Sequence, residues 1–161
     1  MELPYNPQAT LAALAHEHGW DLPEDLHPRL YKALGKPLRR LQPAELLALV
    51  EQGVALPAVA PLAIEKLEAD PMLQANRHPG DLMTALLEAD TRYWQEHFDA
   101  WAEMVGVAAV AVNRVNEAMQ EQGTSDYLPF HLGDDFMGAL LHFREIHRAP
   151  GAPPEREGEA G

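Results

Sequence analysis

Two apolar blocks punctuated by proline constrain the fold of this chain more than any other feature. The first block follows Gly53, and the second ends at the aromatic pair Tyr93-Trp94. A Pro-Gly-Asp corner, Pro79 to Asp81, lies between them. Leucine and alanine recur in both blocks at helical spacing, and no catalytic pattern interrupts them. The segment therefore predicts a helical core, and we expect any function to lie on the surface around it.

Helix signals continue over most of the chain. Helices are expected from Asn6-Pro7 to Gly19, within 21–35, from Pro43 to Gly53, from Ala55 or nearer Pro57, from a cap at Asp81, from a cap at Thr91 to Gly123, and from Asp134-Asp135. Residues 124–132 are expected to form a loop. The predicted fold class is all-α, a single-domain bundle of about seven to eight helices over 1–148. Residues 149–161 lack apolar periodicity and are expected to be a disordered tail.

Two stretches of this pattern are ambiguous. Pro61 removes a backbone hydrogen bond from a helix interior, so a start near Pro57 is favoured, which places Pro61 in or just beyond the first turn. The valines between 105 and 112 could form a strand. Because the apolar spacing continues to Met119, a helix is favoured there.

The spacing of apolar residues predicts which faces point inward. The expected inner positions are Leu26, Leu30, Tyr31 and Leu34 in the second helix, Trp94, Phe98, Trp101 and Val105 as one stripe, and Phe136, Leu140 and Phe143 in the last helix. Glu96, Asp99 and Glu103 share the opposite side of the helix that carries the stripe. This helix is thus expected to have a buried aromatic edge and an acidic outer edge.

Composition and charge restrict the class of partner. The chain has 161 residues, no cysteine and a formal net charge of -13. Such a charge disfavours nucleic acid and anionic membranes and favours a basic protein. The N-terminus Met-Glu-Leu-Pro lacks a secretory signal pattern, and the apolar run 104–112 is too short to span a bilayer. We therefore expect a soluble cytoplasmic protein.

The sequence offers no convincing catalytic, cofactor or metal site. Ser125 is the only serine and does not lie in a nucleophile elbow. Glu24 and His27 have the spacing of a carboxylate-bridged metal motif, but the second motif that such a site needs is missing. The alternative of an enzyme or metal protein would use His27, His97 or His142 with nearby carboxylates. We expect no enzymatic activity and no cofactor.

Acidic residues give the best candidate for a protein-binding surface. They are Glu88, Asp90, Glu96, Asp99 and Glu103. The alternative is a solvated helix face with no partner.

Several blocks resemble one family, the bacterial contact-dependent growth inhibition (CDI) immunity proteins of the small helical type. The blocks are Leu38-Arg39-Arg40-Leu41, Val59-Ala60-Pro61-Leu62-Ala63-Ile64-Glu65, Pro79-Gly80-Asp81-Leu82 and Tyr93-Trp94. The resemblance covers about residues 29–94, and 95–148 form a helical extension. His78 departs from the aromatic residue that is usual before Pro-Gly-Asp in the family.

The resemblance implies a cytoplasmic protein that binds and blocks the toxic C-terminal domain of a contact-delivered effector, often a nuclease. Pro61, Pro79, Gly80, Asp81 and Trp94 belong to the matching blocks, and we interpret them as turn, cap and core elements. A helical adaptor that holds a partner peptide is the alternative function.

Overall fold

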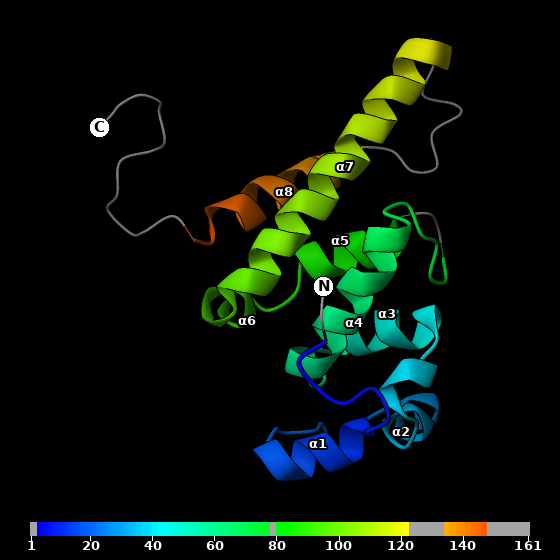
Figure 1. Cartoon of the computed structure of the whole chain (residues 1–161), viewed down its shortest axis with the longest axis vertical. Coiled ribbons are helices and arrows are strands. Elements are labelled where there is room, and N and C mark those ends of the chain that lie inside the picture. Colours follow the sequence, from blue (N-terminus) through cyan, green and yellow to red (C-terminus); the bar gives the residue numbers. More distant parts are fainter. Residues whose placement is uncertain (1–2, 78–79, 123–133, 148–161) are drawn as a thin grey trace.

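The described part of the chain is helical, as the periodicity of the sequence predicts (Figure 1). The computed structural model describes residues 3–77, 80–122 and 134–147. Within these ranges it contains no β-strand, and a short 3-10 helix, η1 (Leu38–Arg40), accompanies the α-helices. The α-helices are α1 (Leu11–His18), α2 (Pro28–Leu34), α3 (Pro43–Gln52), α4 (Leu56–Ala69), α5 (Asp81–Leu87), α6 (Thr91–Glu96), α7 (Phe98–Gln122) and α8 (Asp134–Glu145). The predicted all-α class is confirmed.

Helix α1 starts later than the sequence predicts. Its cap is Thr10, whose hydroxyl oxygen accepts a hydrogen bond from the Ala13 N–H at 3.1 Å. The Asn6 side chain instead accepts from the Gln8 N–H at 2.9 Å and closes a turn ahead of the helix. The predicted start at Asn6 is therefore wrong. The predicted end is confirmed, because Gly19 adopts the left-handed conformation with φ 71°.

Fewer residues face the core in and just before α2 than the sequence predicts. Leu26, Leu30 and Leu34 are buried, as expected. Tyr31 is 48% exposed, and its hydroxyl donates a hydrogen bond to the Glu24 carbonyl. The inward prediction for Tyr31 is wrong. The polar hydroxyl group of Tyr31 forms its hydrogen bond at the surface, whereas the preceding residue, Leu30, is buried.

Helices α3 and α4 pack against each other at the centre of the core. α4 starts at Leu56, which places Pro57 in its first turn, where a backbone N–H has no intrahelical partner. Pro61 follows in the second turn, just beyond the first, as expected. It removes a hydrogen bond to the Pro57 carbonyl, and α4 nevertheless continues to Ala69. Burial of most of its side chains therefore outweighs the missing bond.

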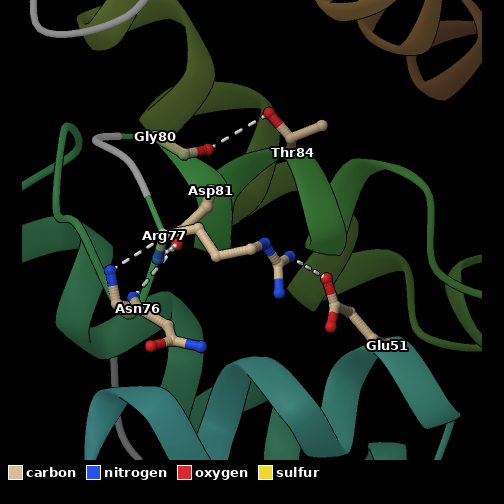
Figure 2. Close-up of polar contacts among 7 residues, drawn as sticks. Glu51, Asn76, Arg77, Gly80, Asp81 and Thr84 are labelled. Atoms are coloured by element: carbon tan, nitrogen blue, oxygen red, sulfur yellow. Dashed lines mark hydrogen bonds and ion pairs between the residues drawn. The ribbon is translucent and has the colours of Figure 1, made fainter.

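Asp81 anchors the loop between α4 and α5 (Figure 2). Its carboxylate accepts backbone hydrogen bonds from Ala75 at 2.8 Å, Asn76 at 3.0 Å and Arg77 at 2.7 Å. The residue is only 3% exposed. Gly80, with φ 84°, occupies the cap position, and Asp81 is the first residue of α5. The predicted helix-cap role of Asp81 is thus wrong, because its carboxylate turns back onto the loop.

The predicted helix from Thr91 to Gly123 is divided into α6 and α7. The cap of α6 is Asp90, whose carboxylate accepts from the Arg92 N–H at 2.9 Å, and not Thr91. At His97 the backbone leaves the helical region, with φ -131° and ψ 71°. The chain changes direction there before α7 begins. α7 then covers 105–112 without interruption, so helix is the correct choice for that stretch.

The break at His97 also removes the predicted aromatic stripe. Trp94 is fully buried, and its core role is confirmed. Phe98 is 56% exposed, whereas Trp101 and Val105 are half-buried. The prediction of one inward stripe is wrong because the three later residues belong to a helix with a different axis from that of Trp94.

Helix α8 closes the core against α5 and the aromatic side chains of α6 and α7. The Trp101 indole N–H donates to the Phe143 carbonyl at 2.8 Å, and His147 Nε2 lies 2.6 Å from the Trp94 carbonyl. Leu140 and Phe143 are buried, and α8 begins at Asp134, as predicted. The predicted burial of Phe136 concerns a side chain outside the described ones.

Some predictions fall on residues outside the described ranges. They concern the turn at Pro79, the helix end at Gly123, the loop over 124–132 and the disordered tail over 149–161. These stay predictions. Nearly all buried apolar side chains of the described ranges form one cluster, which extends from Leu11 to Phe143.

Candidate functional site

An open groove of about 1130 Å³ is lined by residues of α4 and α7, two helices that pack against each other. Its walls come from the N-terminal segment, from α4, from the junction of α6 and α7, and from one face of α7. Pro57, Pro61 and Glu68 represent α4, and Phe98 and Val110 represent α7. We call this hollow the α4–α7 groove. It is larger than a second hollow, of about 390 Å³, between α3 and α5.

Carboxylates dominate the charge of the α4–α7 groove. Glu96, Asp99 and Glu103, the acidic face predicted from sequence, all line it, and α4 adds Glu68. Arg114 is the only lysine or arginine in the described lining. The groove therefore presents a negative potential, which attracts cationic groups.

Two of these carboxyl groups lie close together across the helix contact. The hydrogen bond between the side chains of Glu103 and Glu68 is the main cause that raises the pKa of Glu103, and burial and the charge of Glu68 act in the same direction. Two carboxylates at short range disfavour ionising both. A cation that enters the groove would be attracted by these groups.

The end of the groove at the junction of α6 and α7 is aromatic. The rings of Tyr93 and His97 stack at 4.2 Å between centroids, and His97 Nδ1 lies 2.8 Å from the Tyr93 carbonyl. Burial raises the pKa of the Tyr93 hydroxyl, which keeps it neutral. Tyr5 and the exposed Phe98 complete this end. The break at His97, which sequence reasoning missed, is what exposes Phe98 here.

Gly106 leaves an opening in the α7 wall. A Cβ atom built at this position would meet no described atom within 4 Å. Packing against the described residues thus does not require glycine, which costs a helix interior about 1 kcal/mol relative to alanine. Phe98 at 56% exposure and Val110 at 43% add apolar surface to the same groove.

The other two predicted acidic residues lie elsewhere. Glu88 and Asp90 line a smaller hollow of about 390 Å³ between α3 and α5. Some of its polar side chains already have partners within the chain. Asp90 caps α6, and Arg77 pairs with Glu51 (Figure 2). The structure thus separates the five predicted residues into three at the groove and two at this corner.

The histidines proposed for the enzyme alternative also have local contacts. His27 Nδ1 accepts the Arg29 N–H at 3.1 Å and caps α2, and His142 Nε2 lies 3.5 Å from the Thr91 hydroxyl. His97 belongs to the aromatic end of the groove. Among the described residues, no group of three or more histidine, aspartate or glutamate side chains is placed to hold a metal ion.

Several groove residues were not predicted as functional. They are Glu68, Phe98, Gly106 and Val110. Gly106 carried a signal in the sequence, since it interrupts the apolar run 104–112 inside a helix. Glu68 carried none, because nothing in the sequence places α4 beside α7.

In the described ranges, no helix has both the length and the apolar character needed to cross a membrane.

A family model described as CDI immunity proteins matches residues 20–104, slightly more than half of the chain. The match extends at both ends beyond the predicted resemblance over 29–94. It includes the α4 wall of the groove and the α7 residues up to Met104, whereas Gly106, Val110 and Arg114 lie after it. Comparisons with curated proteins and with solved structures give no match.

Proposed function

The chain belongs to the family of CDI immunity proteins, and from this premise we propose that it binds and neutralises the toxic C-terminal domain of a CDI effector. The family match over 20–104 is the observation that carries the proposal. Neutralisation results from stoichiometric protein binding in the cytoplasm, without turnover of a substrate.

The net negative charge of the chain supports the proposal of a toxin domain with a basic surface, such as a nuclease. A protein with a net charge of -13 attracts a positively charged partner over long range and raises the association rate. Nuclease domains carry positive surface because their substrate is a polyanion. The acidic α4–α7 groove adds a local negative field to this overall charge.

Co-expression tests the proposal directly. The toxin domain is taken from the large secreted protein that we expect to be encoded beside this gene. Induction of the toxin domain alone should stop growth, and co-expression of this chain should restore it. The two proteins should also co-purify at a one-to-one ratio. Continued growth arrest, with both proteins present and soluble, would refute the proposal.

The open groove with its exposed Phe98 and Val110 favours one second candidate, an adaptor for a linear peptide. The two functions differ in what they bind. An adaptor should retain its partner after the partner is unfolded or cut into peptides, whereas an immunity protein should bind only the folded toxin domain and abolish its activity.

A further inference from the structure

Resting on the proposed function, we infer that the α4–α7 groove is the surface that receives the toxin domain. Its occupant is a segment of the toxin domain that presents a lysine or arginine beside an apolar side chain. Size, charge, apolar exposure and the free space at Gly106 support this assignment.

The dimensions of the groove suit a polypeptide segment. Its volume of about 1130 Å³ exceeds the roughly 300–1,000 Å³ of typical small-molecule pockets. The groove is open to solvent, and residues of both α4 and α7 line it. A loop or helix of a folded domain can therefore enter from solvent.

Charge complementarity defines the cationic part of the occupant. Glu68 and Glu103 face each other from α4 and α7, and Asp99 and Glu96 continue the negative wall. The side chains of Glu68 and Glu103 share a hydrogen bond, which brings two carboxyl groups together in the groove. A lysine or arginine placed beside them would be attracted by the carboxylates of the groove.

Exposed apolar surface defines the neighbouring part of the occupant. Of the four large apolar side chains exposed in the described ranges, Phe98 and Val110 line this groove. Burial of such side chains at the centre of an interface is a main source of affinity. The free space above Gly106 lies on the same wall and permits close approach of a partner backbone.

The second hollow lacks these properties. Among its carboxylates, Asp90 caps α6, Glu51 pairs with Arg77 and Asp81 holds the loop at 75–77. A partner that used them would first have to break contacts within the chain. The exposed apolar side chains Phe98 and Val110 line the groove and not this hollow, so the groove offers the better docking surface.

The charge arm of the test measures association with the purified toxin domain at low and physiological salt. The variant Glu96→Gln/Asp99→Asn/Glu103→Gln should lower the association rate constant about tenfold at low salt and flatten its salt dependence. The control Glu17→Gln/Glu24→Gln/Asp25→Asn makes the same change in net charge at exposed positions that do not line the groove. Its association rate should fall by no more than about twofold.

The steric arm uses glycines in two helices. Gly106→Gln should fill the groove and raise the dissociation rate constant about tenfold or more. Gly138→Gln in α8 is the control, because a Cβ there also meets nothing within 4 Å and the residue does not line the groove. Both variants should fold, since glutamine favours helix over glycine. An apolar pair, Val110→Ser against Leu141→Ser, extends the comparison, as both side chains are exposed.

The outcomes separate this inference from the proposed function. If the unmodified protein protects cells and all groove variants bind the toxin domain like their controls, the groove is not the docking surface and the immunity function stands. If the unmodified protein neither protects nor binds, the function itself fails. Weaker binding by the groove variants alone, with unchanged melting temperatures, supports the groove.

Discussion

Two carboxylate sites of this protein show opposite uses of negative charge. At the corner before α5, the buried Asp81 receives hydrogen bonds from three successive backbone N–H groups. At the α4–α7 groove, Glu103 instead faces Glu68, another carboxyl group. The first arrangement satisfies the charge within the fold. The second brings two carboxyl groups together in an open groove that attracts cationic groups, so the comparison distinguishes an acid that stabilises the structure from acids that line a candidate binding surface.

Loss of the corner carboxylate should have the largest effect on stability. Asp81→Ala leaves the N–H groups of residues 75–77 without their acceptor, and we expect a loss of about 3 kcal/mol in the free energy of unfolding. Urea unfolding followed by circular dichroism measures it. Asp81→Asn, which keeps one carbonyl acceptor, should lose less. Equal stability of Asp81→Ala and the unmodified protein would show that the corner does not hold the fold.

The ion pair at the same corner should matter much less. Arg77 and Glu51 are both largely exposed, with side-chain exposures of 53% and 38%. Exposed ion pairs contribute little because solvent screens them. Arg77→Ala should therefore shift the urea midpoint far less than Asp81→Ala, and the shift should vanish at high salt. A shift as large as that of Asp81→Ala would show that the ion pair, and not the backbone hydrogen bonds to Asp81, stabilises the corner.

Substitution of Glu103, which lies beside Glu68 in the groove, should give the smallest change in stability. This change should have the opposite sign. Because the pKa of Glu103 is raised in the folded state, folding favours the protonated form. The contribution of this group is therefore present at low pH and is lost as the pH rises through the raised pKa. Glu103→Gln should remove that decline, so that its melting temperature near pH 7 equals or slightly exceeds that of the unmodified protein.

Melting curves recorded between pH 4 and pH 8 test this sign, with Glu17→Gln as the control at an exposed carboxylate away from the groove. A clear fall in the melting temperature of Glu103→Gln near pH 7 would mean that the ionised carboxylate stabilises the fold. The contrast with Asp81 would then disappear.

Local sequence signals predicted most of the helices but not their junctions. Gly19 and Gly53 ended helices as expected, because glycine adopts the left-handed conformation readily. The break at His97 was missed, since Trp94, Phe98 and Trp101 keep helical spacing across it. A spacing pattern does not report a change of axis between two helices. The exposure of Phe98 depends on that change.

The acidic residues illustrate the same limit at the candidate site. Glu96, Asp99 and Glu103 were chosen for their density on one helix, and they do line one groove. Glu88 and Asp90 were added as their neighbours in the sequence and lie at a different corner, where Asp90 caps α6. Sequence neighbours can serve different surfaces, because the turn before α6 separates them.

By itself, the sequence determined the helical class, the position of most helices and the excess of negative charge, because periodicity, proline and glycine placement and ionisable groups act locally. The family resemblance could also be recognised from short blocks along the chain. Only the tertiary structure brought Glu68 of α4 beside Glu103 of α7, exposed Phe98 and left Gly106 facing open space. Such a groove exists only where two helices cross, and the angle and register of that crossing depend on packing of the whole core.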